Sequence, residues 1–144
     1  MKWTKIIFGA AGFVVVSQIV NLLLAAVTMN YYSDPNYFAV WSKVMMPAAG
    51  PPPEAFFAYS LIFSLITGTI LSYFYVRTHR LISGTATQKG AKYGFALFLI
   101  AGLPFFLTDY LLVNLPFGLL LGWLLGDGLI GYVLGGIAIA RLNG

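Results

Sequence analysis

The sequence predicts an all-α membrane protein, a four-helix transmembrane bundle, and three observations support this fold class. Of its 144 residues, 60% are hydrophobic and only 8% are charged, whereas about a quarter of the residues in a soluble domain are charged. The mean hydropathy is +0.87. Four apolar stretches, over residues 6–29, 55–76, 90–112 and 116–140, each reach the roughly 20 residues that a helix needs to cross a bilayer. We expect one integral membrane domain, 1–144, and exclude a soluble, coiled-coil or disordered chain.

The first apolar stretch begins as a signal peptide would. Lys2 and Lys5 precede it, and Ala25-Ala26 forms a small-residue pair near its end. The apolar run nevertheless continues well past the roughly 7–15 residues of a usual signal-peptide core. We therefore expect an uncleaved first helix.

The placement of Lys and Arg predicts the orientation of the bundle. Only Lys43 falls between the first two stretches; the other basic residues precede the first stretch, flank the connection between the second and third, or follow the fourth, at Lys2, Lys5, Arg77, Arg80, Lys89, Lys92 and Arg141. Positive residues favour the cytoplasmic side. We expect a bacterial inner-membrane protein with both termini cytoplasmic. The pI of 9.4 then reflects topology and an affinity for membrane lipids, and a nucleic-acid partner is excluded.

The segment between the first two stretches predicts a short helix on the outer side. Ser33-Asp34-Pro35 has the pattern of a helix start, with a capping oxygen followed by proline. Apolar side chains then recur at helical spacing, and Pro47 and the Gly50-to-Pro53 run end the pattern. We expect an amphipathic interfacial helix over residues 35–46. Its apolar face is either an aromatic anchor belt, or a lid or partner surface, made by Tyr37, Phe38, Trp41 and Met45.

The inventory of reactive side chains is small. The chain has no cysteine, one histidine and four acidic residues. His79 lies between Arg77 and Arg80 in a polar loop, where we expect a solvated surface residue. The sequence therefore predicts no catalytic residues, no metal site and no cofactor, and we expect the protein not to be an enzyme.

Small residues mark close-packing faces on all four stretches. The second carries small residues four positions apart, and the fourth has glycines around much of its circumference, at Ser60, Ser64, Gly68, Ser72, Gly118, Gly122, Gly126, Gly131 and Gly135. Membrane helices associate through such faces. Packing within the chain is one use; the number of glycines also suggests a homo-oligomer or a subunit of a larger membrane complex.

Asp127, midway along the fourth stretch, is the most informative residue. A carboxylate in the middle of a bilayer is costly unless it is paired, hydrated or protonated. Polar residues at the same depth predict a pocket made by Gln18, Asn21, Ser64, Thr67 and Asp127. No lysine or arginine is expected at that depth. Asp127 is therefore either protonated or bonded to amides, hydroxyls or water.

Two interpretations of Asp127 remain open. Gly126-Asp127-Gly128 is consistent with a break in the helix, where the carboxylate would cap the following half-helix. Alternatively, Asp127 serves a ligand, an ion or a proton. A lipid-modifying enzyme is disfavoured because Asp109, the nearest second acid along the chain, is expected to lie most of a leaflet away in depth.

A resemblance agrees with this fold. Tyr31-Tyr32-Ser33-Asp34-Pro35, followed by Phe38 and Trp41, is similar to a Tyr-Ser-x-Pro…Phe…Trp element that follows the first helix in small four-helix bacterial inner-membrane proteins, a domain family of unknown function. The Asn114-Leu115-Pro116 turn and the Lys89-Gly90…Tyr93-Gly94 start of the third stretch also resemble that family. The resemblance implies a four-helix membrane fold, no known activity and no catalytic residue.

Two functions follow as hypotheses. The first is a non-enzymatic structural or accessory subunit that associates through glycine-rich faces. The alternative is a binding protein or carrier for a small hydrophobic or cationic ligand, which would use the polar pocket around Asp127.

Overall fold

The computed structural model describes residues 3–48 and 50–143, and within these ranges the chain is helical with no strand. Four helices are long and apolar enough to cross a membrane: Trp3–Tyr32, Glu54–Leu81, Ala86–Leu112 and Phe117–Asn143. The all-α class and the four predicted long apolar helices are confirmed. At six of the eight helix ends the helix continues one to five residues past its predicted stretch, because polar residues and caps continue the helices past the apolar cores.

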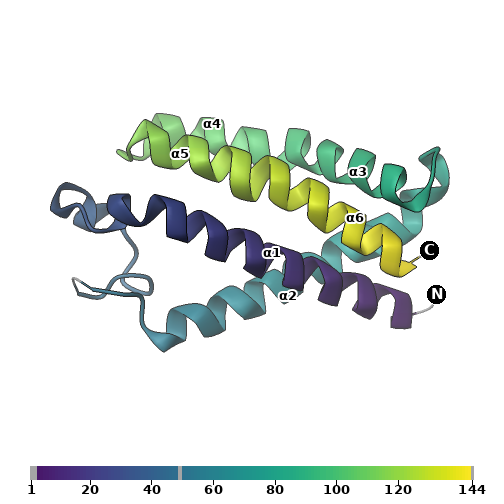
Figure 1. Cartoon of the computed structure of the whole chain (residues 1–144), viewed down its shortest axis with the longest axis horizontal. Helices are drawn as coiled ribbons and strands as arrows, with labels where there is room; N and C mark the ends of the chain where they lie inside the picture. Colours follow the sequence, from purple (N-terminus) through teal and green to yellow (C-terminus); the bar gives the residue numbers. More distant parts are fainter. Residues whose placement is uncertain (1–2, 49, 144) are drawn as a thin grey trace.

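The first two spans are α1 (Trp3–Tyr32) and α2 (Glu54–Thr78), which a short 3-10 turn, η2 (His79–Leu81), follows. The third span joins α3 (Ala86–Leu97) and α4 (Leu103–Leu112) through the π-helical stretch η3 (Phe98–Gly102). The fourth joins α5 (Phe117–Trp123) and α6 (Tyr132–Asn143) through a second π-helical stretch, η4 (Leu124–Gly131). Figure 1 shows α1 between α2 and the α5–α6 span, with the α3–α4 span on the far side of α5–α6.

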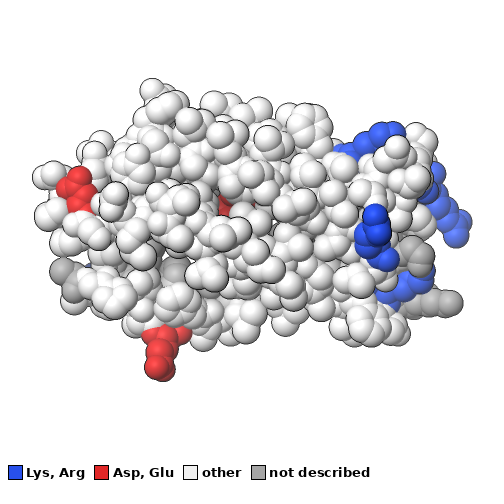
Figure 2. All heavy atoms as spheres, in the orientation of Figure 1, with Lys and Arg blue, Asp and Glu red and all other residues white. Residues whose placement is uncertain are grey.

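Both termini and the α2–α3 connection lie at the same end of the bundle, which we call the terminal end (Figure 1). The α4–α5 connection and residues 33–53 lie at the opposite, distal end. Lys and Arg gather at the terminal end, while the long middle of the molecule is almost free of charge on the face shown (Figure 2). An uncharged belt between two polar ends is the surface that a bilayer requires.

The third span begins at a well-formed cap. Gly84 adopts a φ of +122°, which turns the chain after α2, and Thr85 then forms a capping box with Gln88. The Thr85 Oγ1 accepts from the Gln88 backbone N–H, and the Gln88 Oε1 accepts from the Thr85 N–H. Both otherwise unpaired donors are thereby satisfied.

Glycines bring α3 and α6 into backbone contact. A Cβ built on Gly90 would lie 2.6 Å from the carbonyl oxygen of Gly136, and one on Gly94 would meet the carbonyl oxygen of Tyr132. Gly136 in turn faces Gly90 and Gly94. Close approach between membrane helices of this kind gains dispersion energy that bulkier residues would prevent. These glycines therefore pack within the chain.

A buried aromatic and aliphatic cluster lies in the terminal half of the bundle. It comes from α1, α2, α3 and α6, and consists of Phe13, Tyr75, Tyr93, Ile139 and Ala140. The Tyr93 hydroxyl donates to the Leu71 carbonyl at 2.7 Å, so the buried phenol is satisfied. The distal half lacks a comparable cluster among the described residues, and the cavity described below lies toward that half.

The predicted helix over residues 35–46 is shorter in the structure. Asp34 is the cap, as predicted: its carboxylate accepts from the Asn36 N–H at 3.0 Å, and Pro35 starts the 3-10 helix η1 (Pro35–Val40). The helix ends because Trp41 becomes extended, with φ −72° and ψ 141°. Its indole then packs on the ring of Tyr32 at a centroid distance of 5.0 Å and on Trp123 at 6.2 Å. Aromatic packing against the bundle therefore outweighs continued helix in this segment.

We expect Trp41→Ala to loosen the segment over residues 33–53. Losing two aromatic pairs costs about 1–3 kcal/mol, which raises local opening about fivefold or more. Lys43 is the segment's one basic residue, so trypsin cleavage after Lys43 reports the opening. Trp41→Phe is the control, because the Trp41 Nε1 donates to no partner among the described residues. Equal cleavage rates in the alanine variant and the parent protein would show that the indole does not hold the segment.

Candidate functional site

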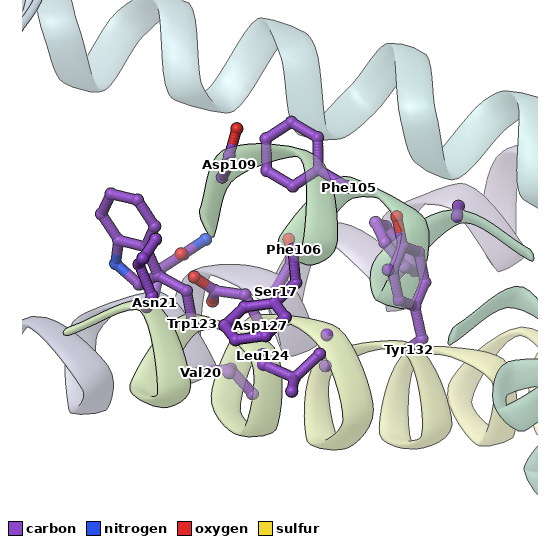
Figure 3. A pocket seen from close by; sticks show the side chains of 16 residues that line it. Ser17, Val20, Asn21, Phe105, Phe106, Asp109, Trp123, Leu124, Asp127 and Tyr132 are labelled. Atoms are coloured by element: carbon purple, nitrogen blue, oxygen red, sulfur yellow. The ribbon is translucent and has the colours of Figure 1, made fainter. Parts of the chain in front are cut away.

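A half-open cavity of about 310 Å³ lies between α1, α4 and the α5–α6 span. Its walls are mainly apolar and include the aromatic side chains of Phe13, Phe105, Phe106, Trp123 and Tyr132. Its polar lining comes from Ser17, Asn21, Asp109 and Asp127. Figure 3 shows Ser17, Asn21, Phe106 and Asp127 close together around a common space. This volume is at the small end of the range for ligand pockets and would hold about ten non-hydrogen atoms, at roughly 30 Å³ each.

Both π-helical stretches border this cavity. Ala101 and Gly102 come from η3, and Leu124, Asp127 and Gly128 come from η4. The two stretches also contact each other. In η3 the N–H of Leu103 reaches the Phe98 carbonyl, five residues back, directly before Pro104, which has no N–H to donate. Wide turns of this type are frequent at functional sites, and here they re-aim the residues that face the cavity.

Asp127 lies within a continuous helix. The span from Phe117 to Asn143 is unbroken, and the Asp127 carboxylate accepts no hydrogen bond from the described residues. The hypothesis that Asp127 caps a half-helix is therefore wrong, because η4 keeps its backbone bonded through the Gly126-Asp127-Gly128 sequence. The carboxylate faces the cavity instead (Figure 3).

No basic residue compensates the two carboxylates of the cavity. The described residues that line it include no lysine, arginine or histidine. An ionised carboxylate in such a place is costly without a counter-charge or water. Protonation of the carboxyl group or a positively charged occupant would each remove that cost.

The five residues predicted to form one pocket do not share one: two line the cavity, two line a second hollow, and Gln18 lines neither. Asn21 and Asp127 line the cavity, together with Ser17. Ser64 and Thr67 instead line a separate hollow of about 600 Å³ between α1, α2 and the segment after η1. Gln18 bridges α1 and α2, where its Nε2 donates to the Ser64 Oγ at 3.0 Å.

The division has a simple cause. Residues three apart on a helix differ by about 60° in direction. Because α1 lies between α2 and the α5–α6 span, that angle is enough to turn Gln18 toward α2 and Asn21 toward the cavity. A prediction that uses only the depth of a residue in the membrane cannot tell the face of α1 that meets α2 from the face that meets the cavity.

Asp109 is the charged residue of the cavity that the predicted pocket did not include. It lies on α4 and lines the same cavity as Asp127. Its separation in depth had disfavoured a joint role, but the cavity extends along the helices and reaches both. In the sequence, Asp109 follows Phe105 and Phe106 by about one helical turn. This spacing places an acid and two aromatic rings on one helix face, which is the pattern that could have indicated the site.

Trp41 supports one wall of the cavity indirectly. Trp123 lines the cavity, its Nε1 donates to the Tyr32 hydroxyl at 3.3 Å, and Trp41 packs against both rings. Trp41 belongs to the surface that the sequence predicted for a lid or a partner, and it packs on the bundle. The other three members, Tyr37, Phe38 and Met45, are half-buried.

Within the described residues, no three His, Cys, Asp or Glu side chains form a group that could hold a metal ion. Comparison of the chain with family models, curated proteins and solved structures found no match. The cavity is therefore the feature of the molecule that points to a function.

Proposed function

We propose that this protein is a binding protein or carrier for a small organic cation with an apolar body, and that the ligand occupies the cavity around Asp127. The observation that carries the proposal is a cavity with aromatic side chains in its walls, whose only charged lining residues, among those described, are carboxylates. Aromatic faces attract organic cations, by about 0.5–2 kcal/mol each. A carboxylate in a low-dielectric site adds the charge recognition.

The orientation is part of the proposal. With the terminal end in the cytoplasm, the Lys and Arg residues at that end (Figure 2) lie on the side that positive residues favour. The segment over residues 33–53 then covers the outer side. The expected membrane is the bacterial inner membrane.

Association with another protein, or with further copies of the chain, remains a second prediction. The glycines that suggested it contact neighbours in the same chain: Gly68 faces Ala10, Gly118 faces Tyr31, and Gly126 faces Leu24. The structure thus offers a ligand site more directly than a free glycine face, and we place the binding function first. Native mass spectrometry of protein extracted gently from its membrane tests the association.

Binding is tested with a cation and its uncharged analogue. Isothermal titration calorimetry of the purified protein in nanodiscs would use benzyltrimethylammonium and neopentylbenzene, which have the same shape and differ in charge. We expect saturable binding of the cation, at least about tenfold tighter than the neutral compound, equivalent to about 1.4 kcal/mol. Equal affinity for the two compounds, or no saturable binding of the cation, would refute the proposed function.

A further inference from the structure

The cavity has an opening between α1 and α4. Both helices line the cavity, but among the described residues each packs on the α5–α6 span and neither packs extensively on the other. Two lining residues of the third span are exposed, Ala101 and Phe105, the latter by 66%. They lie four residues apart and therefore share a helix face. Asn21, which lines the cavity from α1, is exposed as well. These three residues mark the two sides of the opening.

The opening lies at the depth of the lipid tails. The third span, Ala86–Leu112, has 27 residues, and its length of about 40 Å exceeds the hydrocarbon core by about 5 Å at each end when it is centred. Phe105 precedes the distal end of this span by about two helical turns, and Asn21 precedes the distal end of α1 by about three. Both residues therefore lie within the hydrocarbon core, and the cavity opens sideways to the bilayer.

The polar part of the cavity lies directly behind this opening. Figure 3 shows Asn21 close to Ser17 and Asp127, so the Asp127 carboxylate is near the exposed side of the cavity. The volume of about 310 Å³ holds about ten non-hydrogen atoms at roughly 30 Å³ each. That is enough for a quaternary ammonium head and too little for a long alkyl chain in addition. A chain attached to the head must leave through the opening, where lipid tails surround it and keep it out of water.

We propose that the ligand is a single-chain amphiphilic cation that enters the cavity from the bilayer. This inference rests on the proposed function. The ammonium head pairs with the Asp127 carboxylate inside the cavity, and the alkyl chain passes between α1 and α4 and stays among the lipid tails. Because the chain partitions into the bilayer, the ligand is concentrated beside the opening before it binds.

The test compares butyltrimethylammonium with dodecyltrimethylammonium, which share one head and differ in chain length. Calorimetry in nanodiscs uses the dodecyl compound below its critical micelle concentration and subtracts the heat that empty nanodiscs give with each compound. The butyl compound fits within the cavity volume and the dodecyl compound exceeds it. In the parent protein we expect the dodecyl compound to bind at least about tenfold more tightly, whereas a cavity without a lateral opening would exclude it.

Ala101→Trp places a large side chain at the opening. We expect this variant to lose the advantage of the dodecyl compound and to keep the affinity for the butyl compound, which also shows that it is folded. Ala101→Leu narrows the opening less and should lose part of the advantage, and it provides the same test if the tryptophan variant does not fold. Ala96→Trp is the matched control, because Ala96 is exposed on the same span and lies outside the cavity. It should keep the ratio of the two affinities.

Two kinds of failure can be told apart. If the dodecyl compound binds no more tightly than the butyl compound in the parent protein, or if the Ala101 variants keep the same ratio as Ala96→Trp, entry from the bilayer is wrong while the cation site stands. If neither compound nor benzyltrimethylammonium binds, the proposed function itself fails.

Discussion

Replacing Asp127 by asparagine is expected to abolish cation binding and to leave the thermal stability unchanged or higher. Asparagine has nearly the same shape as aspartate, so the cavity keeps its form and loses one charge. The carboxylate accepts no hydrogen bond from the described residues, and a carboxylate at the centre of a membrane helix costs about 2.5–3.5 kcal/mol on insertion scales. Removing that cost stabilises the fold, while the cation loses its counter-charge. Function at the expense of stability is the usual balance at a binding site.

Two measurements on the same preparations check this result. Calorimetry with benzyltrimethylammonium should show at least a tenfold loss of affinity in Asp127→Asn, and partial retention in Asp127→Glu, which keeps the charge. Melting of the ligand-free protein should show no decrease for Asp127→Asn. Glu54→Gln should bind the cation normally, because Glu54 lies outside the cavity. A melting temperature several degrees lower in Asp127→Asn, with binding preserved, would instead assign Asp127 a structural role.

The four spans could be predicted because lipid imposes a strong and simple constraint on the chain. A segment of about 20 apolar residues in a bilayer must satisfy its backbone internally, and the helix is the solution that a single segment offers. The Asp34 cap was equally predictable, since a capping oxygen before Pro35 acts locally. The length of the following helix was not. It depends on Trp41 meeting Tyr32 and Trp123, a contact that joins the ends of distant spans.

The site was predicted in part for a related reason. Asp127 stood out because a membrane charge is rare, and Asn21 shares its cavity. Depth, which a sequence gives approximately, could not decide which face each polar residue presents. Gln18 and Ser64 therefore form a contact of their own beside the site. The π-helical stretches add residues to the turns on either side of the cavity, and no helical periodicity reveals them in advance.

Placing a methyl group at Gly94 is expected to force α3 and α6 apart. A Cβ at this position would meet the Tyr132 carbonyl oxygen and lie 2.6 Å from the Val133 Cα, both backbone atoms. Backbone cannot rotate aside as a side chain can, so the helices must separate along the contact that Gly90 and Gly136 continue. Overpacking of this kind costs about 1–3 kcal/mol. Because η4 leads directly into α6, the cavity should also widen and cation affinity should fall.

Gly122→Ala separates this effect from the general preference of helices for alanine. That preference favours both variants by up to about 1 kcal/mol. A Cβ at Gly122 would meet only the Leu24 Cδ1 at 3.4 Å and the Thr28 Cγ2 at 3.5 Å, ordinary contacts with side chains. We therefore expect thermal melting in nanodiscs to shift down by several degrees in Gly94→Ala, and to stay or shift up in Gly122→Ala. If both variants melted at the parent temperature, backbone contact between α3 and α6 would not be what holds the third and fourth spans together. The shape of the cavity would then not depend on that contact.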